Sequence, residues 1–249
     1  MVRLEKVRTM ENIAYIGLSH QIALQQQVDI IANNVANAST PGFKAQDLLF
    51  SEFLADAGES GEISQVVDES SFTRLSQGSL SQTGNPLDIA ISGDGYFAIE
   101  TAQGVRYSRA GNFVLNAEGT IVTPQGQALL DEGNLPINVP DDGPITITAD
   151  GSVSTPGGNI TRIKVVTFEN RQDLIEIGNG LYDGLPDAEI PDTESQVIQG
   201  AVEQSNVQPV LEITKMIEVS RIYQGVQRFL QTDHDRQRTT IRTLTDTNG

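Results

Sequence analysis

Two stretches near the ends of the chain place apolar residues at helical spacing. In the first, such positions recur every three or four residues from Ile13 to Val35, and in the second they recur from Met216 to Leu230. Residues with this spacing lie on one stripe of an α-helix. The pattern predicts a helix at each end, with an apolar seam formed by Leu24, Val28, Ile31 and Val35 in the first helix and by Met216, Val219, Tyr223, Val226 and Leu230 in the second.

The first helix is expected to end between Asn34 and Ser39. Asn33 and Asn37, like Asn34, are of a residue type that favours helix ends and turns over helix interiors. Pro41 then disfavours the helical conformation of the residue before it. The segment therefore predicts a helix end followed by a sharp turn.

The second helix is expected to begin near Val207. Proline is well suited to the first turn of a helix, because its missing N–H has no partner there, and Pro209 occupies that place. Ser205 or Asn206 is the expected N-cap, since either side chain can accept a hydrogen bond from a free amide of the first turn.

Between these helices the pattern changes to short apolar runs separated by turns rich in Gly, Asn and Asp. Closely spaced runs without a helical period are typical of an all-β domain built from hairpins. We therefore expect a mainly β fold, with terminal helices suited to a coiled-coil-like inner layer and with the two termini side by side. The strand-like runs are residues 88–92, 96–100, 113–115, 145–148 and 160–168.

The same features divide the chain into segments. The Ser-, Glu- and Gly-rich stretch before the strands and the acidic, proline-containing stretch after them are expected to be connectors. The expected segments are a possible extended start (1–9), an N-terminal assembly helix with its turn (10–43), a connector (44–84), an all-β domain (85–182), a return connector (183–204) and a C-terminal assembly helix (205–249).

The charge of −17 is concentrated in the middle of the chain. Residues 46–206 carry six basic and 25 acidic side chains, whereas both ends are nearly neutral. This distribution argues against a nucleic-acid partner, which needs clustered Lys and Arg. We expect no membrane insertion, because no apolar run reaches 18 residues, and no cleavable signal, because the polar residues from Ser19 onward interrupt the first apolar segment.

Candidate catalytic chemistry is sparse. The chain has no cysteine, and its two histidines, His20 and His234, lie on or just beyond the helical seams, where a packing role is expected. Asp88, Asp94 and Glu100 are close in sequence, but Gly-Asp-Gly is first a turn. We expect no catalytic, cofactor-binding or metal-binding residues, no cofactor and no enzymatic activity. A glycan-binding β domain or a glycosidase with paired carboxylates is the alternative of another class.

The two apolar seams allow three arrangements. They can pack against each other within the chain, lie on a membrane surface, or meet seams of neighbouring chains. The polar faces lack the Lys and Arg enrichment of surface-bound helices. Head-to-tail contacts between chains generate open helical filaments when the rotation does not close. Periodicity leaves the choice between pairing within and between chains open.

Several collinear motifs resemble those of the bacterial flagellar rod and hook proteins. The resemblance extends from Met10 over nearly the whole chain, while residues 1–9 match nothing in the family, which favours Met10 as the natural start. The motifs are ANNVANASTPGFK (32–44), TGNPLDIAI (83–91), GDGYF (93–97), YSRAGNF (107–113), QGAVEQSNV (199–207) and MIEVSR (216–221).

The resemblance implies a structural subunit of the periplasmic rod of the flagellar basal body, most like the proximal-rod members. A distal-rod or hook-type axial subunit is the near alternative. It further implies export through the flagellar type III apparatus, assembly with other rod subunits through the terminal helices, and an inner tube built from the seam residues above. The residues implied to set the bend from helix to connector are Asn33, Asn34, Asn37, Thr40, Pro41, Gly42 and Phe43.

Overall fold

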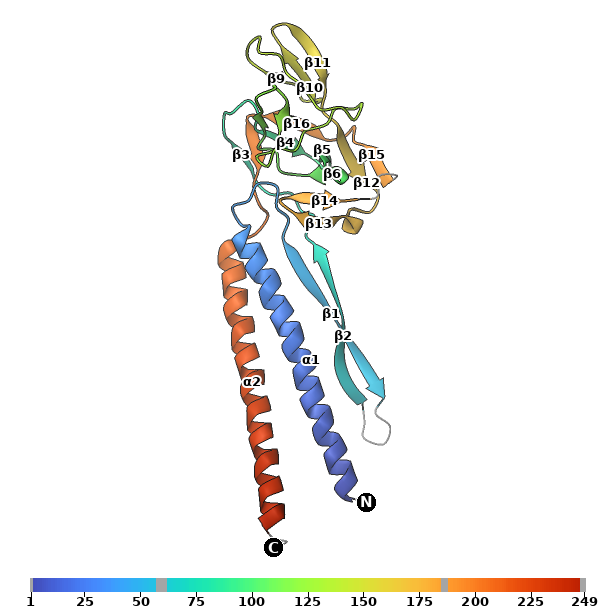
Figure 1. Cartoon of the computed structure of the whole chain (residues 1–249), viewed down its shortest axis with the longest axis vertical. Helices are drawn as coiled ribbons and strands as arrows, with labels where there is room; N and C mark the ends of the chain where they lie inside the picture. Colours follow the sequence, from blue (N-terminus) through green and yellow to red (C-terminus); the bar gives the residue numbers. More distant parts are fainter. Residues whose placement is uncertain (1, 57–61, 185–187, 247–249) are drawn as a thin grey trace. The chain divides into compact units, whose positions relative to one another are not determined.

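The computed structural model describes residues 2–56, 62–184 and 188–246 and divides the chain into two compact units (Figure 1). We call the first the helical unit; it comprises Met1–Ala36, Gln46–Phe72 and Gln208–Gly249. The second, the β unit, comprises Asn37–Ala45 and Thr73–Val207. The chain therefore passes between the two units four times.

The helical unit is built on two long helices, α1 (Val2–Ala36) and α2 (Pro209–Asp246). Both boundaries that the sequence predicted next to the β region agree with the structure. The helices run antiparallel, because Gln21 Nε2 donates to Tyr223 Oη at 3.0 Å, and a Cβ on Gly17, one turn earlier in α1, would lie 2.6 Å from Leu230 Cδ2, further along α2 (Figure 1). No described helix is apolar enough over a sufficient length to cross a membrane.

The predicted seams meet each other within the chain. Leu24, Ile31 and Val219 are buried at the centre of the contact. Burial of each such side chain stabilises the pair by about 1.5–3 kcal/mol, which offsets the marginal stability of long helices that lack a partner. The half-buried residues packed around this centre are Val28, Val35, Met216, Tyr223 and Val226.

The helical unit also contains a two-stranded sheet of β1 (Gln46–Asp56) and β2 (Glu62–Thr73), in the region where the sequence indicated a connector. Its glutamates and aspartates have low β propensity, so composition did not reveal the strands. Asn34, fully buried at the end of α1, fixes the start of β1. Its Nδ2 donates to Gln46 O at 2.8 Å, and Gln46 N donates to its Oδ1 at 2.9 Å.

The β unit consists of several small antiparallel sheets around a six-stranded sheet of order β13-β14-β6-β5-β12-β15. The sheets β16-β4, β17-β3, β7-β8 and β11-β10-β9 complete it. The strands are β3 (Leu80–Gln82), β4 (Ile89–Ser92), β5 (Tyr96–Thr101), β6 (Gly104–Ser108), β7 (Val114–Leu115), β8 (Ile121–Val122), β9 (Thr146–Ile147), β10 (Ser152–Thr155), β11 (Gly158–Arg162), β12 (Val165–Phe168), β13 (Ile175–Gly178), β14 (Leu181–Asp183), β15 (Glu189–Pro191), β16 (Gln196–Gln199) and β17 (Ala201–Glu203), with a short 3₁₀ helix, η2 (Arg171–Asp173), before β13.

The last strands of the β unit return to the first. β16 pairs with β4, so that Val197 lies opposite Ile91, and β17 pairs with β3, so that Val202 lies opposite Ser81. This return brings the chain that precedes α2 beside the chain that follows β2, within the β unit.

One predicted strand and the predicted N-cap are corrected by the structure. The run 160–168 is split between β11 and β12, which belong to different sheets, because Ile163 N and Lys164 N donate to Gly151 O and Leu130 O in the interval. Ser205 and Asn206 do not cap α2 as the sequence indicated. Ser205 Oγ accepts from Val207 N, before the helix begins, and Asn206 bonds to other segments.

Leu24→Ala should lower the free energy of unfolding of the helical unit by about 2–5 kcal/mol, because it leaves a cavity in the helix contact. Leu24 is 5% exposed, whereas Leu18 on the same helix is 52% exposed. The matched change Leu18→Ala should therefore stay within about 0.5 kcal/mol of the wild type. Loss of helical circular dichroism in urea measures both, and equal effects of the two changes would contradict the helix pairing.

Besides its main apolar core, which includes Ile89, Phe97 and Leu129, the β unit has a second core formed by an aromatic cluster. Tyr96 and Tyr107 pack edge-on against Phe168 with ring centroids 6.1 and 4.7 Å apart, and Tyr182 packs edge-on against Tyr96 at 5.8 Å. Burial, the largest cause, raises the pKa of Tyr182 above its usual value, and the carboxylate of Glu176 raises it further. The Tyr182 hydroxyl is buried without a hydrogen-bond partner.

Tyr182→Phe should leave stability at neutral pH unchanged or slightly raised, because it removes an unsatisfied hydroxyl. An unfolded tyrosine ionises near pH ~10 while the folded Tyr182 keeps its proton, so this residue makes stability fall as pH rises above that value. The variant should lose stability less steeply there. Urea unfolding below and above that pH measures the difference, and an unchanged slope would contradict the assignment.

Candidate functional site

The turn after α1 is held in the β unit by local and long-range hydrogen bonds. Thr40 N donates to Asn37 O at 3.1 Å, and Thr40 Oγ1 donates to Asn37 Oδ1 at 3.2 Å, which closes the turn. Gly42 has a φ of +71°, and a Cβ there would clash with the backbone of Arg109 and Ala110. Its N–H donates to Glu203 O at 2.8 Å. Glycine is therefore required at position 42 by both conformation and close packing.

Phe43 anchors the same turn in a small apolar cluster. It is buried with Ala45 and with Val207, and Ala38 packs against the group. Phe43 O accepts from Asn206 N at 3.3 Å. The turn is thus fixed to the segment that precedes α2, which comes from the opposite end of the chain.

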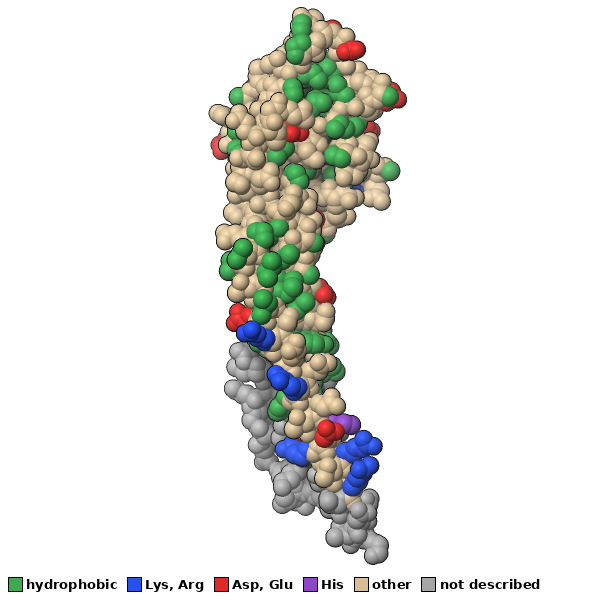
Figure 2. Space-filling view, turned by 90° about the vertical axis from the view of Figure 1, so that its left-hand side faces the viewer, with side chains coloured by type: hydrophobic (Ala, Val, Ile, Leu, Met, Phe, Trp, Pro, Cys, Tyr) green, Lys and Arg blue, Asp and Glu red, His purple; other side chains and the backbone are tan. Residues whose placement is uncertain are grey.

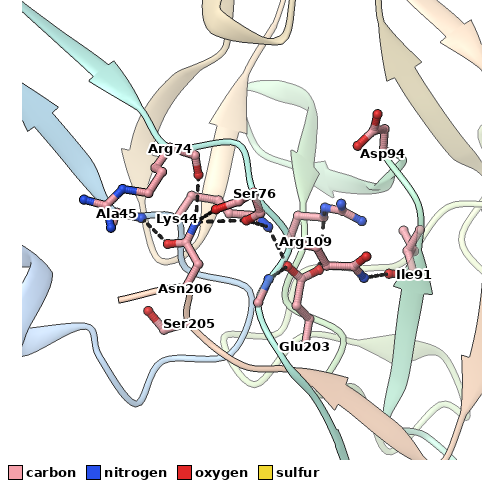
Figure 3. Close-up of polar contacts among 12 residues, drawn as sticks. Lys44, Ala45, Arg74, Ser76, Ile91, Asp94, Arg109, Glu203, Ser205 and Asn206 are labelled. Atoms are coloured by element: carbon pink, nitrogen blue, oxygen red, sulfur yellow. Dashed lines mark hydrogen bonds and ion pairs between the residues drawn. The ribbon is translucent and has the colours of Figure 1, made fainter. Parts of the chain in front are cut away.

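Beside Phe43, the lysine of the turn enters a buried ion cluster (Figure 3). Lys44 is only 1% exposed, and its Nζ lies 2.5 Å from Glu203 Oε1 and donates to Ser76 O at 3.0 Å. Glu203 is equally buried, and its Oε1 also accepts from Gly78 N at 2.9 Å. The pair joins residues that are 159 positions apart in sequence.

Arg109 is the third member of this cluster. Its Nε lies 3.7 Å from Glu203 Oε2, its Nη2 donates to Gly93 O at 2.5 Å, and its guanidinium lies 5.3 Å from the centre of the Tyr96 ring. Arg109 is 2% exposed. We call Lys44, Arg109 and Glu203 the junction cluster.

The electrostatics of the junction cluster are those of a structural site. Burial, the largest cause, lowers the pKa of Lys44, and the neighbouring Glu203 carboxylate partly offsets that effect. Two cations share one carboxylate, so Glu203 is the residue on which both depend. Removing one partner of a buried pair costs about 3–5 kcal/mol, because the other charge is left uncompensated.

The structure distributes the residues that the sequence singled out among separate roles. All nine seam residues lie at the contact between α1 and α2, three of them buried and the other six packed around these. Of the turn residues, Asn34 fixes the start of β1, and Asn37 and Thr40 close the turn. Gly42 and Phe43 hold the turn in the β unit. Pro41 is half-buried within the turn, whereas Asn33 is exposed on α1.

The candidate carboxylates have separate partners. Asp94 bonds to Arg171 at 2.6 Å, and Asp88 accepts from Asn85 Nδ2 at 3.0 Å, while Glu100 is exposed on β5. Within the described residues, no group of three His, Cys, Asp or Glu side chains is arranged to hold a metal ion.

Sequence reasoning missed the junction cluster, although a signal was present. Three of the quoted motifs, at 32–44, 107–113 and 199–207, contain a single charged residue each, and these are Lys44, Arg109 and Glu203. A lone charge inside an otherwise neutral motif is a candidate for a buried ion pair, because buried charges need partners.

Glu203→Gln should destabilise the β unit by about 3–5 kcal/mol, since Lys44 and Arg109 stay buried without their counterion. The matched control is Glu132→Gln. Glu132 pairs with Arg162 at 3.3 Å on the surface, with the two side chains 62% and 47% exposed. That change should cost less than about 1 kcal/mol. Urea unfolding followed by tyrosine fluorescence compares the two, and similar small losses would show that the cluster is not structural.

Comparison with known families matches three regions of the chain. A sequence model for the flagella basal body rod protein matches residues 15–44, which include the second half of α1 and the turn after it. The flagellar hook protein FlgE/F/G D1 domain matches residues 90–155 of the β unit. The flagellar basal body rod FlgEFG protein C-terminal region matches residues 198–243, from β16 into α2.

Individual relatives cover almost the whole chain. The flagellar basal-body rod protein FlgF of Caulobacter vibrioides is 37% identical over 241 residues, which span 94% of this chain and 98% of the relative. FlgF of Mesorhizobium japonicum is 34% identical with the same coverage. The rod protein FlgG of Agrobacterium fabrum is 34% identical over 88% of this chain and 93% of its own length. The resemblance noted in the sequence is thereby confirmed, and this chain belongs to the flagellar basal-body rod protein family.

Proposed function

We propose that this protein is a structural subunit of the flagellar basal-body rod, in the proximal part of the rod. The similarity along the whole length to relatives named as basal-body rod proteins carries the proposal. The FlgF relatives of Caulobacter vibrioides and Mesorhizobium japonicum align with 94% of the chain and the FlgG relative of Agrobacterium fabrum with 88%, which supports the proximal position. The subunit acts in the periplasmic part of the drive shaft and performs no catalysis.

The surface of the helical unit suits assembly with further subunits. The seam between α1 and α2 is already filled, yet both helices carry additional large apolar side chains that face solvent. Figure 2 shows hydrophobic side chains gathered on one face of this unit. The exposed residues are Leu18 and Ile22 on α1 and Val210, Leu211, Ile213, Ile217, Ile222 and Phe229 on α2.

These two sets of apolar residues have different roles in the proposal. The seam residues predicted to act in assembly hold α1 and α2 together as one block. The exposed residues then contact the helices of neighbouring subunits, because a large exposed apolar surface is typical of an interaction site. Each side chain buried in that contact contributes about 1.5–3 kcal/mol. Repeated head-to-tail contacts of this kind build an open helical assembly.

The partners follow from the same proposal. They are other copies of this subunit and the neighbouring rod proteins, and the flagellar type III apparatus exports the chain. A chain exported in an unfolded form has to fold after it emerges, and the intramolecular helix seam provides a stable state before the neighbours arrive.

Ile217→Asp should abolish or strongly reduce swimming, because it places a charge in the contact between subunits, while the isolated protein keeps its wild-type stability. Ile217 is half-exposed on α2, so the monomer loses little burial. Gln227→Asp is the control, with the same charge on an exposed position of the same helix. Swimming on soft agar and thermal unfolding of the purified protein measure the two effects.

A second variant separates the two roles. Val219→Asp changes a seam residue that is 5% exposed and should therefore reduce both the helicity of the isolated protein and swimming. Normal swimming of the Ile217→Asp strain, with the variant protein exported at wild-type level, would contradict the proposed contact surface.

A further inference from the structure

Asn206 occupies an unusual position beside the two chain segments that lead into β1 and out of β2. Its Oδ1 accepts from Ala45 N at 2.7 Å, and its Nδ2 donates to Arg74 O at 2.7 Å (Figure 3). Nδ2 also lies 2.9 Å from Ser76 O and 3.3 Å from Ser76 Oγ. The carboxamide therefore uses its acceptor and its donors on two different segments, both within the β unit.

These hydrogen bonds resemble those of an antiparallel β pair in which the Asn206 side chain replaces one backbone-to-backbone bond. Two opposed residues of an antiparallel pair exchange two N–H to C=O hydrogen bonds. Arg74 N donates to Ala45 O at 2.7 Å, which is one of the two. The return bond from Ala45 N to Arg74 O is bridged by the Asn206 carboxamide. An inserted amide group holds the segments further apart on that side than a direct bond would.

The neighbouring residue is held from the opposite side. Thr73 N donates to Gln172 Oε1 at 3.3 Å, and Gln172 Nε2 donates to Thr73 O at 2.9 Å. Backbone groups of successive strand residues point in opposite directions, so Gln172 binds one edge of the segment at Thr73 while Asn206 and Ala45 bind the other at Arg74. Both edges of the chain leaving β2 are therefore fixed.

From this arrangement we infer that Asn206 is a positioning residue, which sets the separation of the two chain segments at Ala45 and Arg74 within the β unit. The segment 203–207, which precedes α2, thus determines how far apart these two segments lie. Asparagine is required because aspartate would present an acceptor to the carbonyl oxygens of Arg74 and Ser76, and a shorter side chain would not bridge the gap. This role is independent of the proposed contacts between subunits.

The test uses amide hydrogen exchange of the full-length protein, with the variants Asn206→Asp and Asn206→Ala. The informative amide is that of Arg74, because it bonds to Ala45 O and not to Asn206. A positioning role predicts that Arg74 N–H exchanges about tenfold to hundredfold faster in both variants. Amides of β5 and β6 should keep their wild-type protection. Asn159→Asp, an exposed position in the β unit, adds the same charge and should leave Arg74 unchanged.

Either of two exchange results would overturn the inference. If Arg74 N–H keeps its wild-type protection while Ala45 N–H alone exchanges faster, Asn206 only satisfies the amide of Ala45. If the amides of β5 and β6 lose protection to the same extent as Arg74, Asn206 contributes to the stability of the whole β unit and positions nothing in particular. The near-isosteric aspartate variant keeps the size of the side chain, so loss of packing does not account for its effect.

Discussion

The buried contact between Lys44 and Glu203 is the interaction on which the docking of the turn after α1 depends. It brings the turn after the first helix together with the last strand before the second, and Arg109 from a third motif shares the same carboxylate. A buried ion pair adds little net stability compared with an apolar contact of the same size, because both charges lose their hydration. Its value is specificity, since a misplaced turn would leave one charge buried alone.

The helices and the general class of the fold could be predicted from the sequence, because their signals are local. The asparagines and Pro41 end α1, and Pro209 begins α2, each through properties of a few neighbouring residues. The run 160–168 favours a single strand, because apolar and β-branched residues recur along its whole length. Its division depends on bonds from Ile163 and Lys164 to segments that lie elsewhere in the chain. Such partners have no local signature.

The junction cluster shows the same limit for side chains. Three charged residues in three separated motifs were visible, but nothing in their types says which of the acidic residues each cation would meet. The same holds for Asn206, which a local reading assigned to the start of α2. Its carboxamide instead binds Ala45 and Arg74, since the β17–β3 pairing carries it beside them. The strand pairing, and not the local helix-capping propensity of asparagine, determines which groups Asn206 binds.

The pairing of β16 and β17 with β4 and β3 has a consequence for how the molecule is made. These contacts join the first and last parts of the β unit. Lys44 likewise pairs with Glu203, which lies 159 residues further along the chain. Contacts between distant segments form slowly, because a long loop must close before any of them is gained. The β unit therefore closes late in folding, because its last strands, β16 and β17, have to reach β4 and β3 before Lys44 meets Glu203.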